Sequence, residues 1–400
     1  MMNYEIKQEQ GRDALFIYLE GVMDTMTSPS VEEEILKVVR EQPSVPLVLD
    51  LNDLQRISSA GLRVIFRLSK MVGAPFRLVN ASPEVYEVFQ VTGFCEIVDV
   101  NKRPQEVLVE GCEVIGQGAY GTVYRIDPDT VVKVYEHEDA VEMIRREQKL
   151  SKLAFLKGIP TAISYDLVKV GPWYGSMFEM IKAETLNDLL IKEPARQEEF
   201  IRTHADVMHC VHSVEMNPGE LPDNREIFMK RLELVKDVLP KDTVSRLKEL
   251  LEAMPEDLHL IHGDFHMKNV MISEGEPLLI DMETLSTGDP VFDFAGLFVT
   301  YVLFNEDEHD NSTRFLHIPE ELSNSLARRI LEAYADFGEE SHEEEIIDRA
   351  RALAYLQFVY LLHGIGVGDP ALKEKRLEHS ARHLSEILSR IDSLAIGDLL

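Results

Sequence analysis

The sequence predicts two domains: a small α/β domain, in which a sheet is covered by helices, and a larger α+β domain that ends in helices. Three observations lead to this prediction. The first hundred residues alternate strand-forming with helix-forming segments, a polar, proline-containing stretch (NKRPQEVLVEG) follows Val100, and residues 186–256 and 320–400 are largely helical by pattern. A chain of 400 residues is also longer than one ordinary hydrophobic core supports.

The first domain is predicted from short strands separated by amphipathic helices. Residues 13–20 (DALFIYLE) alternate and are rich in strand formers, and residues 47–51 (LVLDL) form an apolar run that suits a buried strand. Between them, residues 30–42 place apolar side chains at helical spacing. A second helix over about 60–72, a strand (PFRLVN) and a third helix (PEVYEVFQVTG) follow. The resulting β-α-β-α-β-α order indicates a sheet covered by helices.

Composition limits the classes of partner and the compartment. With 71 acidic against 41 basic residues the net charge is −30, which disfavours nucleic acids and anionic membrane surfaces. An anionic nucleotide then requires local lysine, backbone N–H groups and Mg²⁺. Three scattered cysteines without a CxxC pair indicate free thiols rather than zinc. Because no basic, apolar leader and no run of roughly 18 apolar residues is present, we expect a cytoplasmic protein.

A serine pair in the first domain lies where a helix is predicted to begin. The run LVLDLNDLQRISSAGLRVIF, preceded by LEGVMDTMTSPSVEEEIL and followed by FRLVNASPEVYEVFQVTGF, resembles the STAS domain of anti-sigma factor antagonists over about residues 3–100. In that family a serine at the start of this helix is phosphorylated to switch the binding of a protein partner. The resemblance places Ser59 there, with Ser58 replacing the family's usual aspartate and Ala60 its usual second serine.

The physical argument for Ser59 is independent of the resemblance. The helix dipole and the free N–H groups of a first turn favour an added phosphate. Alternatively, Ser58 and Ser59 only cap the helix. The sequence leaves both interpretations open.

A glycine-rich segment opens the second domain. It reads Gly116-Gln-Gly118-Ala-Tyr-Gly121-Thr-Val123 and is flanked on both sides by strand-forming residues. Glycines allow backbone N–H groups to approach phosphates without a clash from a Cβ atom. The GxGxxGxV pattern at a β-turn-β therefore predicts a phosphate-covering loop.

Lys133 is predicted to contact the phosphates. It lies inside an apolar strand (VVKVY), twelve residues beyond Gly121. The helix that follows offers Glu142 and Glu147, and we favour Glu147 as the ion-pair partner that holds Lys133 against the phosphates. The alternative is a lysine that extends its ammonium group to solvent at a sheet edge.

Two further segments contain the residue types that phosphoryl transfer needs: LHLIHGDFHMKNVMI at 258–272 and PLLIDMETLSTGDPVFDFAG at 277–296. We assign Asp264 as the catalytic base, and Asn269 with Asp281 as Mg²⁺ ligands. Each of the three follows or precedes an apolar strand, so a hairpin would bring them together. The alternative is that these polar residues only cap turns.

The same segments resemble the aminoglycoside phosphotransferase and choline kinase superfamily. The match covers about residues 112–300. HGDFHMKN and IDME fit the family's HGDxHxxN and IDxE signatures, and GDPVFDFA resembles its GDPxxDLA run. The matching residues are His262, Gly263, Asp264, His266 and Asn269, then Asp281 and Glu283, then Asp293, which in this family supports the catalytic loop.

The resemblance implies a protein-kinase-like fold that uses ATP and Mg²⁺. It implies a STAS-like domain over 1–104 and a phosphotransferase domain over 112–400, with an N-lobe at about 112–180 and a helical C-lobe at about 181–400. The segment MFEMI would then be the hinge between the lobes, with backbone groups of Glu179 and Ile181 available to adenine.

The acceptor stays open at this stage. The HRD, DFG and APE signatures of protein kinases are absent, whereas the glycine loop resembles theirs, so the hydroxyl acceptor is either a small molecule or a protein. The acidic stretch at 343–348 could attract a cationic acceptor, although we favour a solvated charged face. The alternative function is a partner-switching regulator that phosphorylates a STAS serine or only senses nucleotide.

Overall fold

The computed structural model describes residues 4–7, 14–41, 45–72, 75–118, 121–335 and 340–397. The chain divides into two compact units. One comprises Met1–Leu108 together with Val168–Pro172, and the other comprises Val109–Leu167 together with Trp173–Leu400. In the part of the chain described, no helix combines the length and apolar character needed to cross a bilayer.

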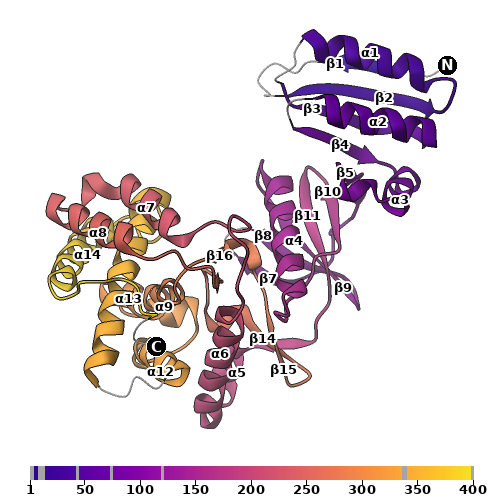
Figure 1. The fold of residues 1–400 in the computed structure, drawn as a ribbon. Coiled ribbons are helices and arrows are strands. Elements are labelled where there is room, and N and C mark those ends of the chain that lie inside the picture. The colour runs from indigo at the N-terminus through magenta and orange to yellow at the C-terminus, as the bar shows by residue number, and fades with distance from the viewer. Residues whose placement is uncertain are drawn as a thin grey trace. The chain divides into compact units, whose positions relative to one another are not determined.

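The first unit is built on a five-stranded sheet (Figure 1). Its elements are β1 (Tyr4–Lys7), β2 (Leu15–Met23), α1 (Ser28–Glu41), β3 (Leu47–Ile57), α2 (Ser59–Met71), β4 (Phe76–Ala81), α3 (Pro83–Val91) and β5 (Asp99–Lys102). The strand order is β1-β2-β3-β4-β5, with β1 antiparallel to β2 and every later pair parallel. Parallel neighbours require helical crossovers, which α1, α2 and α3 supply.

The core of this unit follows the apolar pattern of the sequence, with one departure. Val31, Ile35 and Val39 of α1 are buried, as their helical spacing predicts. Strand β3 continues to Ile57, six residues beyond the predicted strand, and Leu54 remains buried within it. Irregular register between β2 and β3 changes the alternation, so buried residues recur every third position. A search for period two does not detect that spacing.

A second sheet has the order β6-β10-β11-β9-β8-β7. These strands are β6 (Gln105–Glu106), β7 (Glu113–Gly118), β8 (Gly121–Asp127), β9 (Thr130–Tyr135), β10 (Asp166–Val170) and β11 (Trp173–Glu179). Strands β7, β8, β9 and β11 form successive antiparallel pairs. Helix α4 (Ala140–Leu156) follows β9 and packs beside β11, burying Ile144, Leu150 and Ala154. Glu147 shares this buried face and is the charged exception on it.

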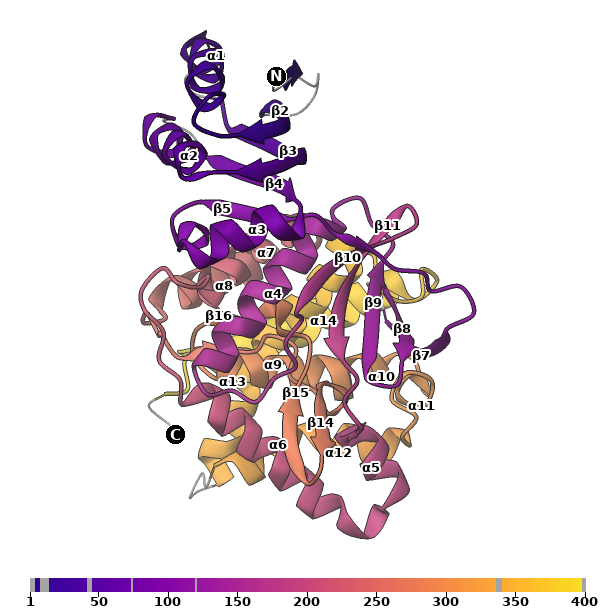
Figure 2. The ribbon, with the colours of Figure 1, turned by 90° about the vertical axis from the view of Figure 1, so that its right-hand side faces the viewer.

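The remainder is helical, as predicted, with short strands near the catalytic segments. Its elements are β12 (Ala183–Thr185), α5 (Leu186–Lys192), α6 (Gln197–His212), α7 (Asn224–Val235), α8 (Lys241–Ala253), β13 (Leu260–Ile261), β14 (Val270–Ser273), β15 (Glu276–Leu279), β16 (Ser286–Thr287), α9 (Val291–Phe298), α10 (Phe304–Glu306), α11 (Asn311–Phe315), α12 (Glu320–Tyr334), α13 (Glu340–Tyr360) and α14 (Lys373–Leu388). Strands β14 and β15 lie side by side as a hairpin (Figure 2).

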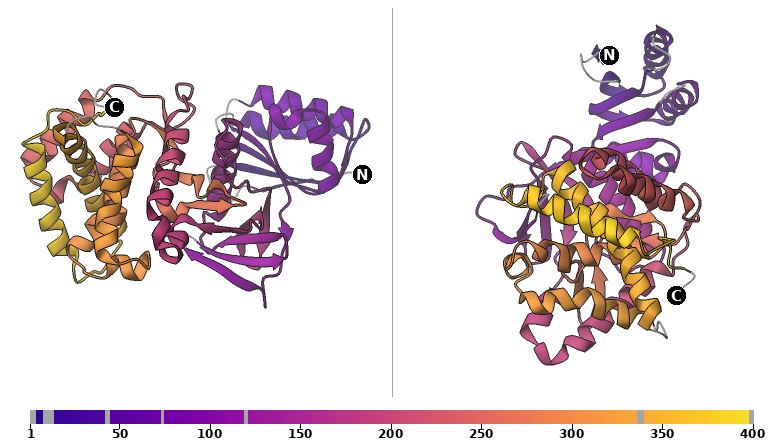
Figure 3. Two further views of the ribbon diagram at one scale, coloured as in Figure 1. Left: turned by 90° about the horizontal axis from the view of Figure 1, so that it is seen from below. Right: turned by 90° about the vertical axis from the view of Figure 1, so that its left-hand side faces the viewer.

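Helix α13 lies at the centre of this helical part. It packs against α7, α9 and α14, and Figure 3 shows the orange and yellow ribbons of the last helices gathered together. Residues 352–356 of α13 (ALAYL) are all buried. A helix that is apolar around its circumference must be surrounded by other elements, which explains its central position.

Candidate active site

The three residues assigned to catalysis and metal binding lie beside short strands. Asp264 follows β13, Asn269 precedes β14 and Asp281 follows β15. Hairpin pairing continues beyond the two strands, because the Ile280 N–H donates to the Asn269 carbonyl oxygen at 3.0 Å. Asn269 and the residue before Asp281 are therefore neighbours at the same end of the hairpin.

Asp264 is held in place but remains accessible. The Asn269 Nδ2 group donates to the Asp264 backbone oxygen at 2.9 Å and lies 3.3 Å from its Oδ2 atom. His266 Nε2 is 3.6 Å from the same Oδ2. The Asp264 side chain is 52% exposed. A carboxylate that is oriented on one side and open on the other can accept a proton from an incoming hydroxyl.

Lys133 contacts two carboxylates. Its Nζ atom lies 2.7 Å from Asp281 Oδ1 and 3.5 Å from Glu147 Oε1. The Tyr135 hydroxyl donates to the other Glu147 oxygen. Burial opposes the charged form, but the nearby Asp281 and Glu147 carboxylates outweigh it and raise the pKa of Lys133. Lys133 is therefore a permanent cation at neutral pH, whereas Glu142 lies on the exposed side of α4.

The glycine-rich segment forms the β7–β8 hairpin. A Cβ atom at Gly121 would collide with the Val134 carbonyl oxygen, so only glycine fits there. Gly116 pairs with Val123 across the two strands, and Gly118 pairs with Gly121. Ala119 and Tyr120, which follow Gly118 in the sequence, lie outside the described residues.

The predicted adenine-binding segment begins at the end of strand β11 of the six-stranded sheet. Glu179 ends β11, and Ile181 lies two residues beyond it. The Met180 N–H between them donates to the Asp129 carbonyl oxygen at 2.8 Å. Within the described residues, neither Glu179 nor Ile181 makes a side-chain hydrogen bond or ion pair with Lys133 or Asp281.

Asp293 supports the loop that carries Asp264. Fully buried in α9, it accepts the His262 N–H at 2.9 Å, the Gly263 N–H at 2.7 Å and His212 Nε2 at 3.0 Å. Burial alone would raise the pKa of Asp293, but the His212 hydrogen bond and charge lower it overall. Sequence reasoning missed His212, because it is 81 residues away on α6 and no local pattern marks it.

Gly263 occupies a position that excludes other residues. Its φ is +84°, and an added Cβ atom would lie 2.8 Å from the Thr284 carbonyl oxygen. The Thr284 hydroxyl in turn donates to the His262 carbonyl oxygen at 2.6 Å. The segments on either side of Asp264 are thus fixed by close contacts as well as by Asp293.

The first unit separates the roles of the two serines. Ser58 is the N-cap of α2, and its hydroxyl accepts the Ala60 N–H at 3.2 Å. Ser59 is the first residue of the helix and is exposed. Capping therefore occupies Ser58 and leaves the Ser59 hydroxyl at the surface.

Comparison with known proteins decides the family. Residues 111–345, more than half of the chain, match the model of the phosphotransferase enzyme family. The chain belongs to that family. Residues 4–107 match the STAS domain, so a STAS domain precedes the phosphotransferase domain. These matches confirm both predicted resemblances and the mixed α/β fold class with a helical C-terminal part.

Individual relatives match one part of this phosphotransferase family member at a time. The anti-sigma F factor antagonist of Paenibacillus polymyxa is 27% identical over 112 residues, covering 27% of this chain and 96% of the relative. The anti-sigma-B factor antagonist of Bacillus subtilis (strain 168) is 23% identical over 107 residues, covering 26% and 96%.

Two solved structures are similar to the larger part. The ADP-bound aminoglycoside phosphotransferase APH(2'')-Ib has 16% identity and a TM-score of 0.48, and the match covers 70% of this chain and 95% of that one. A choline/ethanolamine kinase family protein from Mesorhizobium loti has 17% identity and a TM-score of 0.46, with coverage of 70% and 91%.

A cavity of about 430 Å³ lies beside the catalytic loop of the phosphotransferase domain. We call it the catalytic-loop cavity, and its lining includes Arg146, Asn224, Arg231, Gly263, Glu283 and Gln357. Burial raises the pKa of Glu283, although the charge of Lys133 opposes that shift. The cavity shares Gly263 with the loop that carries Asp264 and therefore adjoins that loop.

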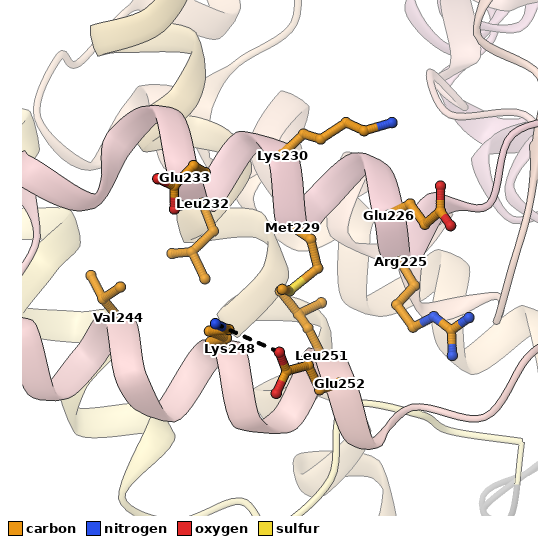
Figure 4. A pocket seen from close by; sticks show the side chains of 10 residues that line it. All are labelled: Arg225, Glu226, Met229, Lys230, Leu232, Glu233, Val244, Lys248, Leu251 and Glu252. Atoms are coloured by element: carbon orange, nitrogen blue, oxygen red, sulfur yellow. Dashed lines mark ion pairs between the residues drawn. The ribbon is translucent and has the colours of Figure 1, made fainter.

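A larger hollow of about 560 Å³ lies between α7 and α8, on another part of the domain. Met229, Leu232 and Leu251 lie between the two helices, whereas Lys230 extends from α7 away from α8 (Figure 4). None of the residues assigned to catalysis, metal or nucleotide lines this groove. We therefore assign no catalytic role to it.

Proposed function

We propose that the phosphotransferase domain transfers the γ-phosphate of ATP to a hydroxyl group of an acceptor. The observation that carries this proposal is the contact of Lys133 with both Glu147 and Asp281, next to the loop of Asp264 and Asn269. A paired lysine, an accessible carboxylate and oxygen donors are what phosphoryl transfer requires, because its catalysis is mostly positioning and charge stabilisation.

The side chains suit Mg²⁺ as the cofactor. Asp281 offers a carboxylate that is 40% exposed. The amide nitrogen of Asn269 is engaged with Asp264, which leaves the amide oxygen available to coordinate a metal ion. Hard oxygen donors are those that Mg²⁺ prefers, and bound Mg²⁺ would neutralise charge on the phosphates. Asn269 and Asp281 are the residues that would hold it.

The remaining residues divide the work of binding and proton transfer. Lys133 supplies a fixed positive charge for the α- and β-phosphates, and Glu147 holds it there. The glycine hairpin offers backbone N–H groups above the phosphates, and the backbone of Glu179 and Ile181 is available to adenine. Asp264 orients the acceptor hydroxyl and receives its proton.

Two substitutions test these roles in the full-length protein. We expect Asp264→Ala to reduce ADP formation by at least about 100-fold while ATP binding persists, because the proton acceptor is lost. Asp281→Ala should weaken Mg²⁺-dependent ATP binding as well. Asp242→Ala, which removes an exposed carboxylate from α8, serves as the matched control. Near-normal ADP formation by both site variants would refute the assignment.

A second function is supported by the exposed Ser59 and by the anti-sigma factor antagonists among the relatives. In this alternative, the STAS domain binds a protein partner, phosphate on Ser59 changes that binding, and the phosphotransferase domain adds the phosphate or only senses nucleotide. A phosphopeptide time course with Mg²⁺ and ATP should compare wild type, Asp264→Ala and Ser59→Ala. Phosphate on Ser59 that depends on Asp264 supports self-modification. An unmodified Ser59 in wild type contradicts it.

A further inference from the structure

Arg231 of α7 is an unusual residue in the lining of the catalytic-loop cavity. Its guanidinium carbon lies 4.7 Å from the centre of the Phe228 ring and 5.4 Å from that of the Tyr360 ring. In the part of the chain described, it makes no ion pair with a carboxylate, in a protein with 71 acidic residues. Burial lowers the pKa of Arg231, and guanidinium groups stay charged in proteins at neutral pH.

Arg231 is half-buried, and among the described residues no hydrogen bond or carboxylate engages its guanidinium group. The two rings stabilise the positive charge through their faces, but they accept none of the five N–H groups along the guanidinium plane. Arginine presents these donors in a fork that matches a carboxylate or a phosphate. The position of Arg231 in the cavity wall makes that fork available to a ligand.

Other lining residues add positive and neutral donors. Arg146 of α4 is exposed and lines the same cavity, and Gln357 of α13 contributes an amide. Glu283 is the single acidic residue among those that line it. The lining residues therefore carry two guanidinium groups against one carboxylate, in contrast with the net negative charge of the whole chain, although the Asp264, Asp281 and Glu147 carboxylates lie close enough to act on Glu283.

The acidic stretch at 343–348, which could have drawn a cationic acceptor, is already engaged. Arg328 pairs with Glu343 at 2.5 Å and also with Glu344. Arg390 pairs with Asp348 at 2.8 Å, and an adjacent arginine on α13 pairs with the remaining glutamate. These carboxylates are neutralised within the protein, so they offer little attraction to a cation.

We propose that the acceptor carries a carboxylate or phosphate group in addition to its reacting hydroxyl, and that Arg231 and Arg146 bind this anionic group. The inference rests on the proposed phosphotransferase function. In the transfer, a bond forms between the acceptor oxygen and the γ-phosphorus. The bond from that phosphorus to the β–γ bridging oxygen breaks, its electron pair stays on ADP, and the hydroxyl proton passes to Asp264.

Binding should be measured before turnover, with three probes that share a three-carbon skeleton. Full-length protein is saturated with ADP and Mg²⁺, so that the nucleotide site is filled, and titrated calorimetrically with D-glycerate, glycerol 3-phosphate and glycerol. Choline serves as the cationic hydroxyl compound. We expect at least one of the two anions to bind, and glycerol and choline to bind at least about tenfold more weakly. Glycerate and glycerol 3-phosphate distinguish a carboxylate from a phosphate ligand.

Matched variants connect the binding to the cavity. Arg231→Gln should weaken the binding of the anion by about tenfold or more. Arg231→Lys keeps the charge but loses the forked pair of donors, so its effect should be intermediate. Lys230→Gln removes the same charge from the adjacent residue, which projects into solvent beside the α7–α8 groove, and should leave the affinity unchanged. If Arg231→Gln does not fold, as shown by circular dichroism, the Arg231→Lys and Arg146→Gln comparisons decide.

The outcomes separate this inference from the proposed function. Three outcomes would overturn the anionic acceptor. Choline could bind more tightly than either anion, or neither anion could bind at tens of millimolar. The third is an equal effect of Arg231→Gln and Lys230→Gln on anion affinity. If choline is phosphorylated and neither anion binds, the phosphotransferase proposal is kept and the anionic substrate class is rejected. Anion binding that depends on the arginines, without any transfer from ATP that depends on Asp264, would keep the anionic ligand and reject the phosphotransferase proposal.

Discussion

Replacing Asp293 by asparagine tests how the catalytic loop is held. One carboxylate oxygen accepts the Gly263 N–H, and the other accepts both the His262 N–H and His212 Nε2. An asparagine keeps one accepting oxygen and places an NH₂ group where the second oxygen was, so that this NH₂ group faces an N–H donor. The least costly orientation places that NH₂ against the single donor, Gly263, and leaves one charge-assisted hydrogen bond unmade. We expect a loss of about 1.5–3 kcal/mol in the free energy of unfolding.

Activity should fall by more than the loss of folded protein explains. Because the His262–Gly263 backbone sets the position of Asp264, we expect ADP formation to decrease about 10–100-fold at a temperature where the variant is folded. The measurements are urea unfolding followed by circular dichroism and ADP formation with Mg²⁺ and ATP.

Asp289→Asn is the matched control for this experiment. Asp289 is also buried in the same segment and accepts three backbone N–H groups, from Val291, Ile396 and Gly397 at 2.9, 2.9 and 3.2 Å. It should lose comparable stability, because the same kind of bond is removed, but retain more activity. Unfolding free energies of Asp293→Asn within about 0.5 kcal/mol of wild type, or equal activity losses in both variants, would refute the reasoning.

Three further predictions concern single positions. Gly263→Ala should destabilise the protein by more than Gly275→Ala, because both have positive φ and pay the left-handed penalty of about 1–2 kcal/mol, but only the first meets a carbonyl oxygen at 2.8 Å; equal unfolding free energies would contradict this. His204 is fully buried, and burial lowers its pKa to about 3 from 6.5, so the unfolded chain binds the extra proton as pH falls below 6.5. The unfolding free energy of wild type relative to His204→Leu should therefore fall by about 1.4 kcal/mol per pH unit between pH 6 and 4, and parallel curves would exclude it. Ser58→Ala should lose about 1 kcal/mol of stability as a lost N-cap, whereas Ser59→Ala should stay within about 0.5 kcal/mol; the reverse order would reassign the cap.

The sequence predicted those features that depend on local patterns. Apolar strands near Asp264, Asn269 and Asp281 indicated a hairpin. The structure forms one from β14 and β15, beside Asn269 and Asp281, whereas β13, which precedes Asp264, pairs with β16. The choice between Glu142 and Glu147 follows from helical phase, since Glu147 shares the buried face of α4. These inferences required only residues close together in the chain.

Features that depend on tertiary packing could not be predicted in this way. His212 reaches Asp293 across 81 residues because α6 packs where it does, and nothing in QEEFIRTHADVMHCVH marks that histidine. The extension of β3 to Ile57 depends on irregular pairing with β2, which a period-two search cannot detect. Arg231 has significance only once Phe228 and Tyr360 are known to be beside it.

The α7 residues of the catalytic-loop cavity lie outside the family signatures, although Gly263 and Glu283 of those signatures line the same cavity. Asn224, Phe228 and Arg231 recur at spacings of four and three along α7, so one face of this helix lines the catalytic-loop cavity, while its other face lines the α7–α8 groove. None of these residues belongs to the HGDxHxxN or IDxE motifs, and none contacts the Asp293 network through a hydrogen bond among those described. If this face binds the acceptor as proposed, substitutions on it should change acceptor binding and leave the residues around Asp264 in place. Membership of the phosphotransferase family does not define the acceptor, so the anionic acceptor remains a proposal that depends on Arg231 of α7 and Arg146 of α4.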